Sequence, residues 1–146
     1  MNKIIVIGCP GSGKSTLSVN LGKQLNIPVH HLDNWQDSSP EDFKRVQDEL
    51  MKEDKWILDG NFTKSIENRA TKADMVIFLD FPRWVVYWRA TKRYFMDFKN
   101  IANHFSETWG LFKYIWKFPR KEIHSILARQ KEDRKIVILH NQRESN

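Results

Sequence analysis

The residues best suited to do chemistry form a glycine-rich segment near the start of the chain. Residues 8–15 read GCPGSGKS, which fits the phosphate-binding pattern G-x-x-x-x-G-K-[ST] without a mismatch. Small residues let successive backbone N–H groups turn inward toward an anion. A helix that follows adds unpaired N–H donors and the positive end of its dipole. The segment therefore predicts a site for a polyphosphate ligand.

Each part of this segment has an expected role in binding ATP and Mg²⁺. Lys14 would reach the β- and γ-phosphates as a point charge, and the Ser15 hydroxyl would hold Mg²⁺. The residues expected to contact the nucleotide are Gly8, Pro10, Gly11, Ser12, Gly13, Lys14, Ser15 and Thr16. A glycine turn that merely mimics the motif is the alternative, and the apolar strand and helix that flank the segment disfavour it.

Apolar runs along the chain predict the elements that must position this segment. Short buried strands are expected at 4–7, 29–32, 56–58, 75–79 and 136–139. Helical patterns separate them, at 15–25, 40–52, 63–71, 82–93, 94–118 and 120–130. This alternation indicates repeated βαβ units, and hence an α/β fold whose five-stranded parallel sheet is covered by helices on both faces.

Polar residues recur where these strands end. Asp33, Asp59 and Asp80 each close a strand, and Asn61 follows two positions after Asp59. Ligands of open parallel sheets bind at the carboxyl ends of the strands, where these loops gather. We therefore expect the carboxylates to face the phosphate-binding segment. For Asp80 we prefer a structural role, because an Asp before Phe-Pro is also a turn residue.

The same strand ends carry a family resemblance. The sequences WILDGN and VIFLDFP, with Arg89 and Arg93 four positions apart on the next helix, resemble the adenylate kinase-like small kinases. A longer series is similar to the bacterial topology modulation, or FlaR-related, proteins and spans most of the chain. That series reads HLD, WILDGNF, ADMVIFLDFPRW, YIWKFPR and KIVILH.

This resemblance implies a fold and several site residues. The fold is a three-layer P-loop NTPase sheet of strand order 2-3-1-4-5, in a single P-loop kinase-like domain over 1–146 with a short helical lid at about 94–119. Asp59 would help to hold the metal through a water molecule. Arg89 and Arg93 would serve the nucleotide base and the transferring phosphoryl group.

The two arginines are also chemically reasonable without the resemblance. Phosphoryl transfer is accelerated mainly by positive charge around the moving group and by placement of the acceptor. Spacing of four residues puts Arg89 and Arg93 on one helix face. We expect both to act in catalysis with Lys14, and a solvated basic surface is the alternative.

The acceptor side is less defined by the sequence. Asp33 could orient an acceptor hydroxyl and accept its proton, or it could cap the following turn. Arg69 could face an acceptor phosphate or form a surface ion pair. Asn61 is a further substrate-binding candidate, and Arg120 could supply the lid with charge, because 94–119 contains no arginine. The identity of the acceptor stays open.

Composition bounds the class of protein. A chain of 146 residues suits one domain, and no apolar run approaches the roughly 18 residues that would cross a bilayer. The one cysteine, Cys9, excludes an intramolecular disulfide and fits a reducing compartment. It is interpreted as a small loop residue, with a reactive thiol as the alternative. We expect a cytoplasmic protein without a membrane partner, and its oligomeric state is open.

An ATP-dependent kinase for a small molecule or nucleotide is the leading hypothesis, with a nucleotide-regulated DNA-binding or DNA-topology-modulating protein as the alternative. The net charge of +6 suits either one. No helix-turn-helix, zinc or heptad signature supports DNA binding. A regulatory GTPase is disfavoured because D-x-x-G and N-K-x-D are absent.

Two further groups of residues have simple structural interpretations. The neighbours His30 and His31 would point to opposite faces of a strand, so a shared metal ion is disfavoured. The tryptophans of the last helices are expected to pack in the core or in a lid more often than to stack on bases. They are Trp84, Trp88, Trp109 and Trp116.

Overall fold

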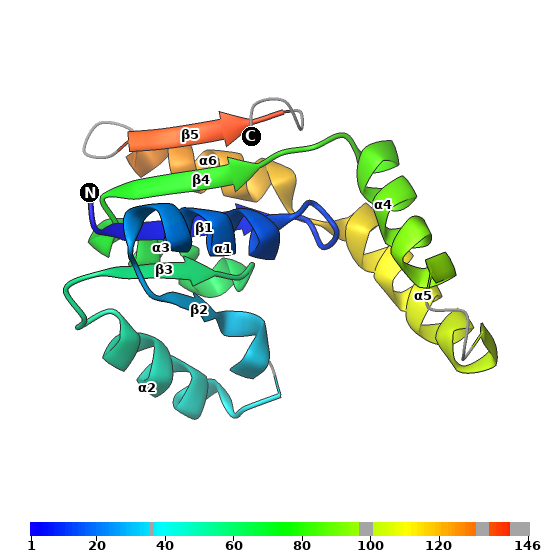
Figure 1. The fold of residues 1–146 in the computed structure, drawn as a ribbon, viewed down its shortest axis with the longest axis horizontal. Coiled ribbons are helices and arrows are strands. Elements are labelled where there is room, and N and C mark those ends of the chain that lie inside the picture. The colour runs from blue at the N-terminus through cyan, green and yellow to red at the C-terminus, as the bar shows by residue number, and fades with distance from the viewer. Residues whose placement is uncertain (36, 97–100, 131–134, 141–146) are drawn as a thin grey trace.

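The protein has three layers, with a parallel sheet between helices (Figure 1). The computed structural model describes residues 1–35, 37–96, 101–130 and 135–140. The five strands are β1 (Lys3–Gly8), β2 (Val29–His31), β3 (Trp56–Asp59), β4 (Met75–Leu79) and β5 (Lys135–Leu139). They are all parallel and run in the order β2-β3-β1-β4-β5, which confirms the predicted fold class and strand order.

The helices begin and end where local sequence chemistry favours it. They are α1 (Lys14–Leu25), the 3-10 turn η1 (Leu32–Trp35), α2 (Pro40–Leu50), α3 (Thr63–Lys72), α4 (Arg83–Met96), α5 (Ile101–Lys117) and α6 (Arg120–Gln130). At the start of α2, the Ser39 hydroxyl accepts the Asp42 N–H at 3.1 Å. At the end of α1, Asn26 takes a left-handed conformation with φ of 54°.

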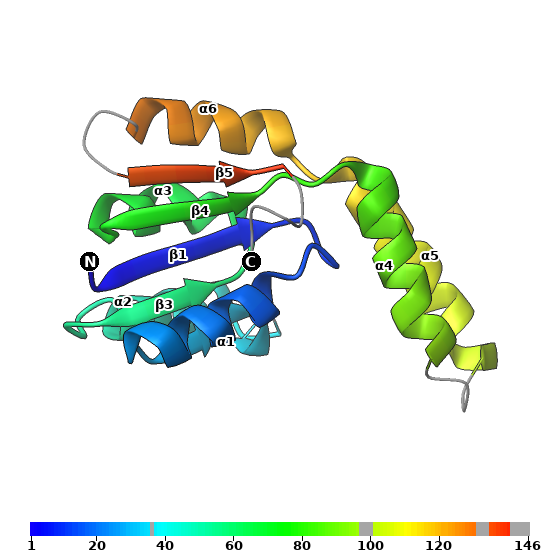
Figure 2. The same ribbon diagram turned by 45° about the horizontal axis from the view of Figure 1, so that its top comes forward.

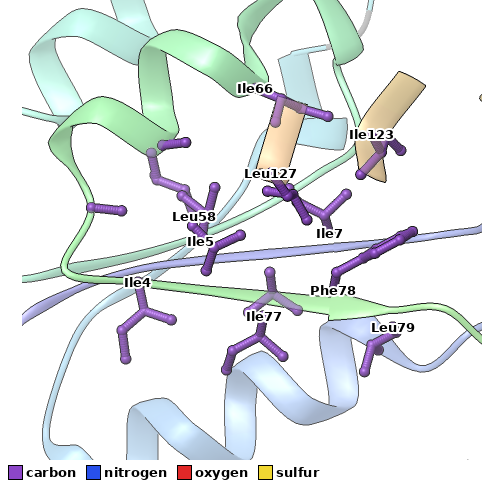
Figure 3. Close-up of a cluster of buried hydrophobic side chains, with 14 of the residues drawn as sticks. Ile4, Ile5, Ile7, Leu58, Ile66, Ile77, Phe78, Leu79, Ile123 and Leu127 are labelled. Carbon is purple, nitrogen blue, oxygen red and sulfur yellow. The ribbon is translucent and has the colours of Figure 1, made fainter. Parts of the chain in front are cut away.

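Alternate side chains of the strands fill the two sides of the sheet. Ile5 and Ile7 lie on the side of α3 and α6, near Ile66 and Leu127, whereas Ile4 lies on the side of α1 (Figure 3). These five side chains are almost completely buried. Because β1 is the central strand and is packed on both faces, the segment that follows it begins from a rigid anchor.

Helices α4 and α5 lie side by side in both views and project from the edge of the sheet at which the strands end (Figures 1 and 2). We call residues 83–117 the α4–α5 hairpin. The Tyr87 hydroxyl of α4 donates to the Phe112 carbonyl of α5 at 3.3 Å. The expected lid segment, 94–119, falls largely in this hairpin. None of the helices in the described ranges has the length and apolarity to cross a membrane.

Four tryptophans of the α4–α5 hairpin lie on its surface. Their exposed fractions are 73% for Trp84, 69% for Trp88, 56% for Trp109 and 64% for Trp116. Of the two packings expected for them, the one in the core is therefore wrong, and the one in a lid stays a prediction. Helical spacing alone does not distinguish a core face from a bare one, and a projecting hairpin buries only the side chains between its two helices.

Candidate functional site

The phosphate-binding segment forms a tight loop between β1 and α1. Gly11 and Gly13 have φ values of 82° and 93°, in the left-handed region that side-chain-bearing residues rarely adopt. The Ser12 N–H donates to the Cys9 carbonyl at 3.0 Å, which closes the turn. The loop therefore has the curvature that lets backbone N–H groups converge on an anion.

The loop leaves no room for a side chain at its first glycine. A Cβ atom added at Gly8 would lie 2.6 Å from the Ser12 hydroxyl oxygen and 2.9 Å from Leu79 Cβ. The Gly8 N–H donates at 3.1 Å to the side-chain oxygen of Asn61, which follows β3. Asn61 thus ties the segment that follows β3 to the phosphate-binding loop.

The start of α1 supplies positive charge at the same place. Lys14 is only 7% exposed, and its Nζ donates to the Cys9 carbonyl at 3.4 Å, so the ammonium lies against the loop. No acidic residue occupies the first turn of α1, and Gly13 provides no capping side chain. Ser15 and Thr16 follow in that turn and are exposed. The helix N-terminus therefore remains available to an anion.

Arg89 reaches the loop from α4. Its Nη1 donates to the Ser12 carbonyl at 3.0 Å, and its guanidinium lies 5.0 Å from the centre of the Phe81 ring. Arg89 therefore reaches the phosphate-binding loop, and its role at the transferring phosphate stays a prediction. Arg93 lies four residues further along α4, and its side chain falls outside the described part of the structure.

Asp59 is held by a histidine from the neighbouring strand. The register of β2 and β3 places His31 beside Asp59, and His31 Nδ1 donates to Asp59 Oδ2 at 2.9 Å. Asp59 is 2% exposed, and its other oxygen, Oδ1, is buried with no hydrogen-bond partner among the residues that the structure describes. A buried, unpaired carboxylate oxygen at a strand end is suited to a water molecule bound to Mg²⁺.

The donor set fits a magnesium ion that arrives with its nucleotide. Within the described ranges, no cluster of three or more His, Cys, Asp or Glu side chains could enclose a metal ion. Mg²⁺ in phosphoryl-transfer sites is usually bound by one or two protein oxygens, phosphate oxygens and water. Ser15 and Asp59 would therefore be sufficient protein partners for the ion.

Arg69 lies beneath the loop that follows β3. It is completely buried, and it donates to the Gly60 carbonyl at 3.0 Å and to the Phe62 carbonyl at 3.3 Å. Burial lowers the pKa of Arg69 to about 10, although Asp33 and Asp59 act in the opposite direction, so it remains charged near pH 7. This burial rules out the surface ion pair that was one alternative for Arg69, and the other, contact with an acceptor phosphate, stays a prediction.

Replacing Arg69 with methionine should destabilise the fold. The methionine side chain fills most of the volume but leaves two loop carbonyls without donors. Because the variant no longer buries a charge, the net loss in the free energy of unfolding should be about 2 kcal/mol. Urea unfolding measures the change. The Arg69→Lys variant separates charge from geometry, because an ammonium cannot bridge both carbonyls as a guanidinium does. Wild-type stability of Arg69→Met would contradict the loop-holding role.

A cavity opens between the phosphate-binding loop and α5. Its volume is about 590 Å³, and its lining consists of Pro10, Asp33, Asn61, Phe62, Gly110, Leu111 and Tyr114. Asp33 lies in η1, directly after β2, and is exposed. Burial raises the pKa of Tyr114, which hydrogen-bonds to Asn61, so the phenol is protonated near pH 7. The cavity is large enough for a small-molecule ligand.

Arg120 and Asp80 meet at the turn between β4 and α4. Arg120 donates to the Phe81 carbonyl, and its Nε lies 3.5 Å from Asp80 Oδ1. His124 donates to the other Asp80 oxygen at 2.8 Å. These contacts fit the structural role preferred for Asp80. They place Arg120 at the base of the α4–α5 hairpin.

Cys9 should be chemically inert. Its side chain is 1% exposed, and burial raises the pKa of its thiol to about 11, although Lys14, Arg120 and Arg83 act in the opposite direction. A rise of about two units lowers the thiolate fraction roughly 100-fold near pH 7. A disulfide reagent should therefore modify the native protein at least about 100-fold more slowly than the urea-unfolded chain. Equal rates would restore the reactive-thiol interpretation.

Comparison with known proteins places the chain in a family. The AAA domain family matches residues 4–109. The chain belongs to this family. The matched part of this AAA domain includes the phosphate-binding loop, Asp33, Asp59 and Arg89. An uncharacterized protein of Bacillus subtilis (strain 168), YqaC, is 33% identical over 107 residues, which are 66% of this chain and 59% of that protein.

Two solved structures share the fold of this AAA domain. Shikimate kinase from Acinetobacter baumannii, in complex with shikimate, is 15% identical with a TM-score of 0.63, over 97% of this chain and 85% of that one. Shikimate kinase from Bacteroides thetaiotaomicron is 14% identical with a TM-score of 0.54, over 92% and 84%. At such identities the likeness shows a common P-loop kinase fold.

Sequence reasoning missed two residues of this site. His31 was considered only as a metal ligand, yet it orients Asp59. The HLD sequence places His31 two residues before Asp33, and parallel register could have indicated its partner. Tyr114 has no motif of its own, and only the fold of the α4–α5 hairpin brings it to Asn61 and Asp33.

Proposed function

We propose that this protein transfers the γ-phosphoryl group of ATP to a hydroxyl group of a small-molecule or nucleotide acceptor. The observation that carries this proposal is the cavity shared by Pro10 of the phosphate-binding loop and Asp33. It gives an acceptor room between a carboxylate and the loop that would hold the phosphates. Positioning of this kind is the main protein contribution to phosphoryl transfer.

On the nucleotide side, the loop from Gly8 to Thr16 binds the phosphates through its N–H groups, and Lys14 neutralises their charge. Ser15 and Asp59 would hold Mg²⁺, and the ion would supply further positive charge to the phosphates. Arg89 and Arg93 provide the charge that stabilises the moving phosphoryl group. His31 orients Asp59 through the observed hydrogen bond.

On the acceptor side, Asp33 orients the attacking hydroxyl and accepts its proton. The hydroxyl oxygen forms the new O–P bond while the bond from the γ-phosphorus to the bridging oxygen breaks, and ADP leaves. Asn61 contacts the acceptor, and Arg69 holds the loop that presents it. Residues 94–119, most of which belong to the α4–α5 hairpin, close the site as a lid, with Arg120 at its base. We also propose that the protein is related to the bacterial topology modulation proteins.

A coupled assay of ADP release tests this function. The wild-type protein is incubated with ATP and Mg²⁺, with nucleoside monophosphates, nucleosides, sugars or hydroxy acids added one at a time. A kinase should release ADP at least about 100-fold faster with its acceptor than with water alone, because the acceptor completes the reacting geometry. Slow release that no added compound changes would overturn the proposal.

A second candidate function rests on the charge of the α4–α5 hairpin. Residues 83–117 contain seven basic and two acidic residues, whereas the rest of the chain contains seventeen basic and sixteen acidic residues. Trp84 and Trp88 are exposed on the same segment. Cations beside exposed aromatic rings are typical of surfaces that bind nucleic acid. The candidate is therefore a nucleotide-regulated DNA-binding protein.

Binding to labelled DNA across a range of salt concentrations distinguishes this candidate. Phosphate contacts give a log-log slope of about −0.9 per neutralised phosphate of duplex DNA. A steep slope that Trp84→Ala and Lys92→Ala both weaken would support DNA binding. No association at low salt would remove it and leave the kinase as the one function to pursue.

A further inference from the structure

The cavity beside the phosphate-binding loop is lined by an acidic side chain and by uncharged ones. Among the seven lining residues in the described part of the chain, Asp33 is the charged one, and it is acidic. Asn61 and the Tyr114 hydroxyl add hydrogen-bonding groups that carry no charge at neutral pH. Phe62 and Leu111 add apolar surface. A ligand in this cavity thus meets a carboxylate, two uncharged polar groups and an apolar wall.

From this lining we propose that the acceptor is a polyol or an amino alcohol that carries no anionic group. The inference rests on the proposed kinase function and names the class of its acceptor. An anionic acceptor in this cavity would lie beside Asp33, whose charge repels it at short range. A neutral or cationic hydroxyl compound meets no such repulsion, and an ammonium group would gain an ion pair.

Four cations near this cavity, among the side chains that the structure describes, make contacts of their own. The guanidinium of Arg69 is fully buried and donates to the carbonyls of Gly60 and Phe62, so it lies behind the lining near Asp33 and is not itself a lining residue. Lys14 and Arg89 lie against the phosphate-binding loop, where the nucleotide phosphates need them. Arg120 contacts Asp80 and the Phe81 carbonyl. None of these four lines the cavity.

A neighbouring cavity, which adjoins the first at Phe62, does carry cations. It has a volume of about 780 Å³ between α2 and α3, and Lys44 and Lys64 are among its lining residues. No residue of the phosphate-binding loop lines it, and Phe62 is the wall that both cavities share. An anion held there would not share a cavity with the loop. The charge of the first cavity therefore decides which hydroxyl compounds react.

Acceptors that share a skeleton and differ in the charge of one substituent test the inference. The wild-type protein is assayed for ADP release with glucose, glucosamine and glucuronate, with adenosine and AMP, and with further sets built on the same principle. Within each set that supports turnover, the neutral or cationic compound should have a kcat/KM at least about tenfold above its anionic counterpart. Higher kcat/KM for the anionic members would overturn the inference and leave the kinase function intact. The absence of any acceptor-dependent turnover would overturn both.

A charge introduced into the lining provides an independent test. Leu111→Lys places an ammonium in the cavity, and Leu111→Met is its uncharged control. The lysine variant should raise kcat/KM for anionic acceptors about fivefold or more relative to their neutral counterparts, whereas the methionine variant should leave that ratio unchanged. An unchanged ratio in the folded lysine variant would show that this cavity does not select the acceptor. Circular dichroism establishes that both variants fold.

Discussion

Replacing Lys14 with alanine is expected to lower the turnover number by about 10³-fold or more while leaving the fold intact. Lys14 lies against the loop backbone, with its Nζ 3.4 Å from the Cys9 carbonyl. The charge is therefore positioned before the nucleotide binds, and preorganised charge at a developing transition state is the largest contribution in sites of this type. Steady-state ADP release with a saturating acceptor measures the loss.

A matched variant on the same helix distinguishes the catalytic role of Lys14 from an effect of the net charge of the protein. Lys23 occupies the last turn of the same helix and is exposed, so Lys23→Ala removes the same charge at the far end of α1. Its turnover should stay within about twofold of wild type, because exposed charges contribute little at that distance. If Lys14→Ala retained a tenth of wild-type turnover, the loop would not serve as the phosphate site of the reaction.

Replacing Arg89 with alanine should lower kcat by roughly 10² to 10³-fold, with a smaller effect on the KM for ATP. The guanidinium is fixed at the loop by its 3.0 Å bond to the Ser12 carbonyl and by the Phe81 ring. An arginine that acts on the moving phosphoryl group stabilises the transition state more than the bound substrate. Separate kcat and KM values distinguish these two effects.

The lysine variant and a neighbour on α4 serve as controls for Arg89. Arg89→Lys should recover little of the rate, because an ammonium cannot present the planar fork that Arg89 offers. Lys92→Ala removes an exposed charge three residues further along the helix and should leave kcat nearly unchanged. An equal loss in Arg89→Ala and Lys92→Ala would mean that the helix acts through its overall charge.

Features encoded by local sequence could be predicted before the structure. The glycine pattern determines the loop at Gly8–Ser15 because only small residues fit it, as the 2.6 Å approach at Gly8 shows. Each strand of the parallel sheet is a short apolar run, so each could be predicted from its own local sequence. Their C-terminal ends place Asp33 and Asp59 at one edge, and that follows from topology alone.

Features set by contacts between distant segments could not be predicted. The spacing of Arg69 on α3 gives no hint that its guanidinium turns inward to two carbonyls of its own loop. The pairing of His31 with Asp59 depends on strand register, and the approach of Tyr114 to Asn61 depends on how the α4–α5 hairpin folds back. Trp84 and Trp88 have the helical spacing of core residues but are exposed. Helical periodicity shows that two side chains share a face of a helix, and it does not show whether another element covers that face.

Transfer of an isotopically labelled γ-phosphoryl group tests the central claim most directly. The protein is incubated with ATP labelled with ¹⁸O in the γ-phosphoryl group and with the acceptor that most stimulates ADP release, and the products are separated by mass spectrometry. We predict that the label appears in a phosphorylated acceptor in a one-to-one ratio with ADP, and that Lys14→Ala forms neither product. Label recovered only in inorganic phosphate would show transfer to water and would contradict the assignment of a kinase.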